Sequence, residues 1–202
     1  ASRWITGEAA RAHVQHQRHR FRGIMEGVGT VLADDPSLEC HMEGGRNPVR
    51  IICDTHLLTP PEAQVVTTAG STSTILATCC TDEKRLNTYQ SKGCQVLCLH
   101  AENNHVDLVQ LMEQLGQMQI DSVLLEGGGT LNWAALNAGI VQQVQAYIAP
   151  KLFGGKDAKT PVEGLGVPSP AAAFHLKDSR ICRLGEDFLI ESEVAYPCSP
   201  ES

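Results

Sequence analysis

The sequence predicts an α/β fold with a mostly parallel central sheet, helices on both faces and an antiparallel hairpin at the carboxyl end. In the first two thirds of the chain, short apolar runs typical of buried strands alternate with helical patterns. Near the end, two strand patterns at 174–184 and 187–194 flank a Gly-Glu pair, which indicates a hairpin. The length of 202 residues fits one domain with a sizeable core.

The chain is expected to open with a helix from near Thr6, whose hydroxyl would cap it, to about Arg20. The glycine-punctuated segment 23–29 reads as extended, and Thr30 would cap a short helical turn that ends at the Asp-Asp-Pro sequence 34–36. Helical patterns follow at 82–91 and 106–117, and a proline- and glycine-rich connection at 150–170. The remaining strands are expected at 49–53, 74–78, 95–99, 123–125 and 145–149.

Composition excludes several classes of protein. The net charge is −7 with no block of lysine or arginine, which argues against a nucleic acid or an anionic membrane as the partner. No apolar run approaches the roughly 20 residues that span a bilayer, and the amino terminus lacks a signal-peptide pattern. We therefore expect a cytoplasmic protein.

No metal site is expected. The eight cysteines lie largely in apolar runs and read as reduced, buried thiols. The closest pairs, Cys79 with Cys80 and Cys94 with Cys98, lack matching ligands. Histidines at 13, 16 and 19 spread around a helix, so a solvated helix surface is the preferred interpretation.

The stretch 122–134 is the most informative part of the chain. An apolar strand pattern ends in Glu126 and three glycines, and an apolar helix pattern follows. Glycines let a ligand approach the backbone, and the free N–H groups of a first helical turn favour an anion. The sequence therefore predicts a phosphate site, with a tight turn without ligand as the alternative. The spacing is not that of a dinucleotide fingerprint.

Four segments stand in order at 2–6, 27–36, 125–131 and 149–154. Together they resemble the reductase domain of the bifunctional riboflavin-biosynthesis deaminase/reductase, over Ser2 to about Glu193. The resemblance implies a dihydrofolate-reductase-like fold, a homodimer and a covalently attached deaminase domain. It also implies reduction, by NADPH, of the ribosyl group of 5-amino-6-(5-phospho-ribosylamino)uracil to 5-amino-6-(5-phospho-ribitylamino)uracil.

The resemblance also implies site residues. For the substrate, Arg18 would bind the 5-phosphate with its charged fork, and Glu126 would accept hydrogen bonds from the uracil or sugar and assist proton transfer. The other substrate-binding residues would be Ser2, Leu38 and His41. The cofactor-binding residues would be Trp4, Thr30, Asp34, Thr55 as a weaker member, Gly128, Gly129, Thr130, Leu131, Asn132, Trp133 and Ala134. No arginine for a 2′-phosphate stands out, so the preference for NADPH rests on the resemblance alone.

Two features depart from the family pattern. His41 stands where the family usually has an arginine, which puts substrate affinity in doubt because histidine binds phosphate with pH dependence. The family's first strand has no counterpart in the sequence. We therefore expect a single reductase domain over 1–202 that lacks its first strand and an upstream deaminase domain, and a sheet with an unpaired edge.

Other interpretations remain open at this point. The chain would alternatively be a dihydrofolate or pterin reductase of the same fold, or a nucleotide-binding module without turnover. Individual residues also have simpler interpretations. Arg18 would be a surface residue, Glu126 a strand end, Asp34 part of a helix stop, and Trp133 a core residue.

Overall fold

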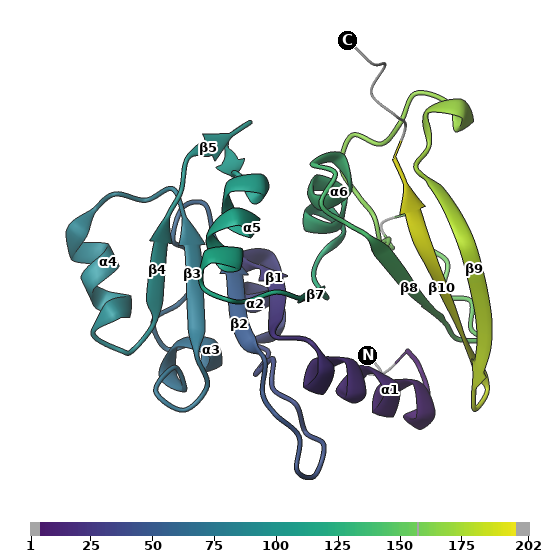
Figure 1. Ribbon diagram of the computed structural model, residues 1–202, viewed down its shortest axis with the longest axis horizontal. Helices are drawn as coiled ribbons and strands as arrows, with labels where there is room; N and C mark the ends of the chain where they lie inside the picture. Colours follow the sequence, from purple (N-terminus) through teal and green to yellow (C-terminus); the bar gives the residue numbers. More distant parts are fainter. Residues whose placement is uncertain (1–4, 157, 197–202) are drawn as a thin grey trace.

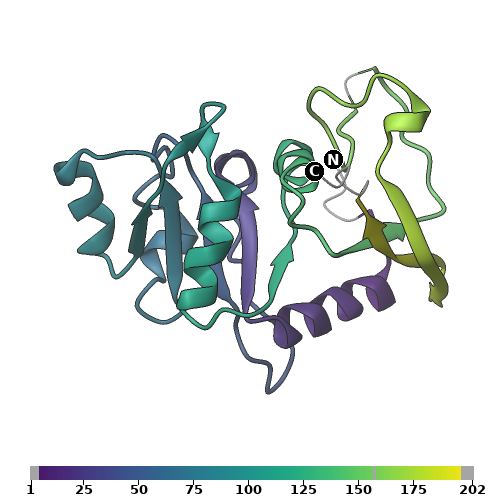
Figure 2. The same cartoon turned by 45° about the horizontal axis from the view of Figure 1, so that its top comes forward.

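The computed structural model describes residues 5–156 and 158–196, so the predicted site residues Ser2 and Trp4 lie outside the described residues. Two sheets stand side by side, and helix α1 (Glu8–Arg20) runs beneath both (Figures 1 and 2). No described helix has the length and apolar character that a membrane span requires.

The first sheet is entirely parallel and has the order β4-β3-β2-β1-β7. The strands match the apolar runs of the sequence to within one or two residues at each end. They are β1 (Gly23–Gly27), β2 (Val49–Cys53), β3 (Thr74–Thr78), β4 (Gln95–Cys98) and β7 (Val123–Leu125). The parallel core of the predicted fold is therefore confirmed.

Alternate residues of each strand point to opposite faces of this sheet and belong to two separate cores. Ile24, Ile52 and Leu76 pack against one group of helices, while Met25 and Ile51 pack against the other. The first face is covered by α2 (Val28–Asp34), α3 (Gln64–Thr67) and α4 (Glu83–Gln90), and the second by α5 (Leu108–Gln117) and α6 (Gly129–Asn137). Helices on both faces explain why the strands read as continuous apolar runs.

Side chains cap some helices as local sequence predicts, but not all of them. The Asp82 side chain accepts hydrogen bonds from the backbone of Lys84 and Arg85 at the start of α4, and Asp107 caps α5 in the same way. The predicted cap at Thr6 was wrong. Gly7 is the N-cap of α1 and makes no side-chain cap. Its N–H donates to the Asp187 carboxylate at 2.7 Å, so a tertiary contact replaces the local one.

The second sheet is antiparallel, with the order β8-β10-β9. Strand β8 (Gln143–Ile148) pairs with β10 (Asp187–Ala195), which forms the predicted hairpin with β9 (His175–Leu184). The hairpin belongs to a separate sheet, because β7 and β8 share no hydrogen-bonded pairing. Short elements complete the described chain: β5 (Ala101–Glu102), β6 (His105–Val106) and the 3₁₀ turn η1 (Pro170–Ala172).

Helix α1 ties the two sheets together. Near its amino end, Gly7 contacts Asp187 of β10, and His13 Nδ1 lies 2.8 Å from the Tyr147 hydroxyl of β8. Near its carboxyl end, Arg18 contacts the segment that follows β7. Polar residues of one helix therefore contact both sheets.

Candidate active site

The candidate site lies where strands β1 and β7 end. From β1, the chain crosses to β2 on one side, whereas β7 pairs with β1 on the other side. This is the point at which the strand order reverses, and open parallel sheets bind ligands at the carboxyl ends of strands beside such a point. Glu126 follows β7 directly, and its N–H donates to Met25 O of β1 at 3.1 Å.

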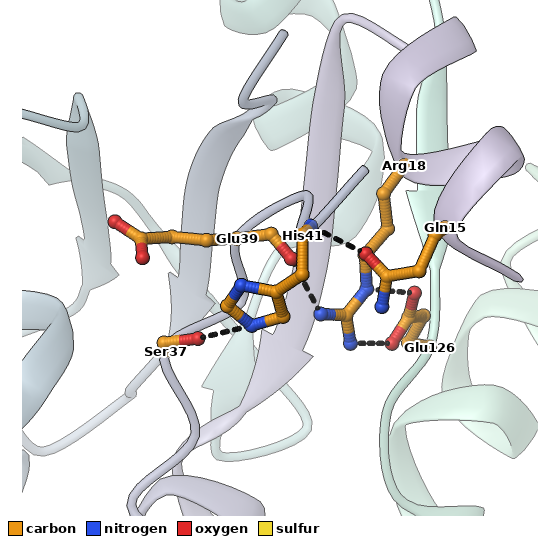
Figure 3. A network of polar contacts seen from close by, with 6 residues as sticks. All are labelled: Gln15, Arg18, Ser37, Glu39, His41 and Glu126. Carbon is orange, nitrogen blue, oxygen red and sulfur yellow. Dashed lines mark hydrogen bonds and ion pairs between the residues drawn. The ribbon is translucent and has the colours of Figure 1, made fainter. Parts of the chain in front are cut away.

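Arg18 and Glu126 form the polar centre of the site (Figure 3). Arg18 Nε donates to one Glu126 oxygen at 2.8 Å, and Nη2 donates to the other at 2.6 Å. Arg18 Nη1 donates to the Glu39 carbonyl at 2.9 Å. Burial opposes the charged form of Arg18, but the hydrogen bonds and charge of Glu126 outweigh it and raise the Arg18 pKa. The two residues predicted to bind substrate from distant segments thus meet in one bidentate pair.

This pairing leaves binding capacity unused. A guanidinium has five N–H donors, and the contacts above use three of them. The side chains of Arg18 and Glu126 are 15% and 20% exposed, so a ligand can reach both. The pair is therefore suited to a ligand that carries an anionic group and neighbouring N–H or O–H donors.

The predicted substrate residues Leu38 and His41 lie near this pair in different environments. His41 is exposed; its N–H donates to the Gln15 side chain at 2.7 Å, and its ring contacts Ser37 at 3.4 Å (Figure 3). Leu38 is 2% exposed, belongs to the core beneath α2 and has a left-handed φ of 52°. Its side chain is thus occupied by packing, which leaves its main chain as the part available to a ligand.

Glu26 is a site residue that the sequence interpretation missed. It lies in β1, is 5% exposed, and its Oε2 has no hydrogen-bond partner in the described part of the chain. A Cβ built on Gly127 would lie 1.8 Å from this oxygen, so the carboxyl group occupies the space beside Gly127. Burial, followed by the charge of Glu126, raises the pKa of Glu26 to about 8, against the effect of Arg18. The signal in the sequence was an acid within the apolar strand 23–27, which needs an explanation because buried charges are costly.

The glycine turn continues into α6 as predicted. Gly128 is the N-cap with a φ of 52°, a conformation that side chains rarely adopt, and the helix begins at Gly129. Thr30 of α2 approaches the turn, since its hydroxyl lies 3.7 Å from the Cβ position of Gly128. The first N–H groups of α6 lack helical partners and carry partial positive charge. This start of a helix fits the pyrophosphate of a dinucleotide.

A loop of the chain already lies against this helix start. Glu163 N donates to Gly129 O at 3.0 Å, and Thr130 Oγ1 lies 3.5 Å from the Glu163 carboxylate. Asn132 Nδ2 donates to Pro161 O at 2.8 Å. A carboxylate therefore stands next to the helix start at which the phosphate is predicted.

The other predicted cofactor residues divide between the site and the core. Asp34 ends α2, is exposed and acts electrostatically on Glu26, so it lies near the glycine turn. Trp133 packs edge-on against Phe174, with ring centroids 5.9 Å apart, in agreement with its interpretation as a packing residue. Leu131 and Ala134 pack against the core on the α5 face.

Thr55 lies further along the same edge, next to a cavity of about 540 Å³. The cavity is open at the ends of β2 and β3, and its walls include Thr55, His56, Cys79, Cys80, Arg85 and Asn104. Arg85 donates to the carbonyls of His56 and Leu57, both at 2.7 Å. The sequence pattern did not single out Arg85, because a helix and a strand end 29 residues apart form this contact. No group of three potential metal ligands occurs among residues 5–156 and 158–196.

Comparisons with known proteins show the family of the chain. The RibD C-terminal domain family model matches residues 1–190. The chain is 48% identical over 196 residues to the riboflavin biosynthesis protein RibD of Actinobacillus pleuropneumoniae, covering 97% of this chain and 52% of that protein. It is 37% identical to the 2,5-diamino-6-ribosylamino-4(3H)-pyrimidinone 5′-phosphate reductase of Methanothermobacter thermautotrophicus, covering 94% and 88% of the two chains.

A solved structure of Acinetobacter baumannii RibD is similar in fold, with a TM-score of 0.80 and 25% identity over 96% of this chain and 52% of that one. The chain thus spans about half the length of the RibD proteins that it matches. The family model covers nearly the whole sequence, and the archaeal relative matches over most of its own length. The chain therefore belongs to the RibD C-terminal domain family.

Proposed function

We propose that this chain is the reductase that converts 5-amino-6-(5-phospho-ribosylamino)uracil to 5-amino-6-(5-phospho-ribitylamino)uracil with NADPH. The observation that carries the proposal is the bidentate Arg18–Glu126 pair beside the Gly128 turn. This pair supplies a cation and a carboxylate that can bind a phosphorylated pyrimidine. It lies next to the start of a helix that can bind a pyrophosphate. The family and the names of its relatives support the same reaction.

The residues of the chain bind and orient in this proposal. The unused N–H donors of Arg18 hold the substrate phosphate, and Glu126 accepts hydrogen bonds from pyrimidine or sugar groups and assists proton transfer. When NADPH is bound, its nicotinamide supplies the hydride. The turn at Gly128 and the start of α6 hold the pyrophosphate, with Thr30 and Asp34 beside it. Positioning of this kind contributes to rate without a covalent nucleophile.

The cofactor is proposed to extend along the carboxyl edge of the sheet. From Gly128 after β7, this edge leads past Thr30 after β1 to Thr55 after β2 and its cavity. A cavity of about 540 Å³ is large enough for the adenosine end of a dinucleotide. Arg85 supplies a permanent positive charge there, which favours the 2′-phosphate of NADPH over the hydroxyl of NADH.

An assay with three substrates tests the proposed reaction. NADPH oxidation is followed by absorbance with the phosphorylated ribosylaminouracil, with its 2,5-diamino-pyrimidinone counterpart and with dihydrofolate. We expect turnover with the first compound. Turnover with dihydrofolate alone would make the chain a pterin reductase, and NADPH binding without oxidation in a single turnover would make it a binding module.

The diamino-pyrimidinone is the second candidate substrate. The archaeal relative at 37% identity is named for that compound, whose ring differs from the uracil at one exocyclic position. Higher kcat/KM with the diamino compound than with the uracil would replace our substrate with this one.

We further propose that a strand from outside the described residues lies between β7 and β8, with a deaminase domain elsewhere in the complete protein. Each of these strands lies at the edge of its sheet, and a single inserted strand would join the two sheets. Hydrogen exchange checks this proposal, because amides of β8 should become protected in a longer form of the protein. Equal exchange in both forms would contradict it.

We also propose that the protein is cytoplasmic and forms a homodimer. The described cysteines are free thiols, as is usual in a reducing compartment. The outer strand β9 exposes Leu176 and Ile181, and Phe188 of β10 is 40% exposed, which provides an apolar surface for a second copy. Sedimentation velocity of the purified protein tests the dimer, and a concentration-independent monomer would exclude it.

A further inference from the structure

Glu26 has an unusual environment for an acidic residue. It is 5% exposed within a parallel strand, with Ile52 of β2 as its neighbour in register. Its Oε2 is buried and has no hydrogen-bond partner among the described residues. An ionised carboxylate without donors is strongly disfavoured in such a place, whereas a neutral carboxyl group is tolerated.

The charged and titratable groups around Glu26 come from every element packed against it. Arg18 approaches from α1, Asp34 from α2, Cys53 from β2, and Glu126 from the turn after β7. Arg18 is the only cation among these four residues, and its contacts are directed to Glu126 and the Glu39 carbonyl. Two carboxyl groups thus lie near one guanidinium, and the guanidinium donates its hydrogen bonds to Glu126.

The backbone explains why Glu26 remains beside this pair. Gly127 leaves room for the carboxyl group, because a Cβ at that position would fall within 2.6 Å of three of its atoms. The Glu26 carboxyl therefore packs directly against the turn that presents Glu126. A change in its charge would act on the Arg18–Glu126 pair from a fixed short range, in a region of low dielectric constant.

We propose that Glu26 is a positioning residue of the reductase site: as a neutral carboxyl it leaves Arg18 bound to Glu126, and as a carboxylate it draws Arg18 away and weakens substrate binding. This inference rests on the proposed function for its ligand, a phosphorylated ribosylaminopyrimidine, but its structural part concerns Arg18 and Glu126 alone. The pKa of about 8 places the change in a pH range in which the enzyme is folded and assayable.

Kinetics of the protein and of Glu26→Gln test the positioning role. The glutamine has the same shape and stays neutral, so KM for the phosphorylated substrate should be equal in both at low pH. Between about pH 6.5 and about pH 9.5, KM of the wild type should rise roughly tenfold, with a smaller change in kcat, while KM of Glu26→Gln stays flat. Glu113→Gln, which makes the same change on the exposed surface of α5, should follow the wild type.

Two results would overturn the proposal. A rise in KM of Glu26→Gln parallel to the wild type would assign the pH dependence to another group. A loss of kcat in Glu26→Gln at every pH would make Glu26 a proton donor rather than a positioning residue.

An NMR measurement of the wild-type protein keeps the test independent of turnover. The Nε–H of Arg18 is held by Glu126 and should give a resolved ¹⁵N–¹H signal, assigned through its absence in Arg18→Lys. This signal should shift or broaden as the pH passes about 8. A constant signal across that range would exclude the proposed rearrangement, whereas failure of the substrate assay alone would affect only the proposed reaction.

Discussion

Glu26 and Gly127 fit together so closely that each explains the other. The Glu26 carboxyl group fills the place that a side chain at position 127 would need, with Oε2 1.8 Å from the expected Cβ. The backbone of Gly127 is not in the left-handed region, so conformational freedom is not the reason for glycine here. The buried acid of β1 is the reason. Gly127 thus leaves room for a side chain, whereas Gly128 adopts a left-handed φ.

Gly127→Ala should therefore destabilise the protein. The new methyl group would push the Glu26 carboxyl from its buried position, at a cost of about 1 to 3 kcal/mol in the free energy of unfolding. Adding Glu26→Ala should remove most of that penalty, which a double-mutant cycle by urea denaturation measures. Gly116→Ala is the matched control, because its Cβ meets open space on α5. Additive effects of the two substitutions would contradict the contact.

The stability of the protein should decline with pH relative to Glu26→Gln. The folded-state pKa of Glu26 is about 8, above its ordinary value of 4.5, so the folded protein retains a proton that the unfolded chain has lost. The wild type is thus penalised increasingly between those two pH values, by at most about 1.4 kcal/mol per pH unit, and constantly above them. Denaturant melts at several pH values should show the gap widening from pH 5 to pH 8. A gap independent of pH would mean that Glu26 ionises normally.

Arg18→Ala should impair substrate binding more than cofactor binding. The substitution removes a charge-assisted contact to the substrate phosphate and frees Glu126, so KM should rise by roughly 10- to 100-fold. The Kd of NADPH should change by less than about threefold, because the Gly128 turn is left in place. Arg18→Lys keeps the charge without the bidentate fork, so its KM should lie between those of the wild type and of Arg18→Ala. Equal losses of substrate and NADPH binding would rule out the assigned role.

Glu163→Gln should strengthen NADPH binding. The Glu163 carboxylate stands next to Thr130 at the start of α6, where we propose that the pyrophosphate binds. Removing this negative charge should lower the Kd of NADPH by roughly threefold to tenfold, which fluorescence titration measures. Glu113→Gln serves as the control for a lost surface charge. An unchanged Kd would place the pyrophosphate elsewhere.

Arg85→Ala should reduce the preference for NADPH. Loss of the guanidinium beside the Thr55 cavity should raise the Kd of NADPH about tenfold and leave that of NADH within about twofold. The neighbouring Lys84 is an exposed cation on the same helix, so Lys84→Ala is the control. A parallel weakening of both cofactors would indicate that Arg85 only supports the His56 and Leu57 backbone.

The sequence predicted the parallel sheet because its signals are local. Strands buried on both faces appear as continuous apolar runs, and β2, β3 and β7 begin and end at the predicted residues. The separation of the second sheet was not predictable, because the local patterns of β7 and β8 do not show whether the two strands pair. The same limit applied at Thr6, where a contact between Gly7 and Asp187 replaced the expected local cap.

The candidate site was partly predictable for the same reason. The turn at Gly128 follows from adjacent residues, and the resemblance to a family supplied Arg18 and Glu126. Their mutual ion pair joins residues 108 positions apart, and no spacing rule indicates it. Glu26 was overlooked because an acid inside a short strand reads as an edge residue until the burial of that strand is known.

The two sheets are unequally supported, which has a consequence for unfolding. The two large apolar clusters belong to the parallel sheet and its helices, whereas nearly every residue of β9 is exposed and β10 buries few apolar side chains, such as Leu189 and Val194. Regions with few buried contacts open first and act as separate cooperative units. The β8-β10-β9 sheet should thus be the least protected foldon, and its detachment would release the amino end of α1 while Arg18 remains anchored to the stable half.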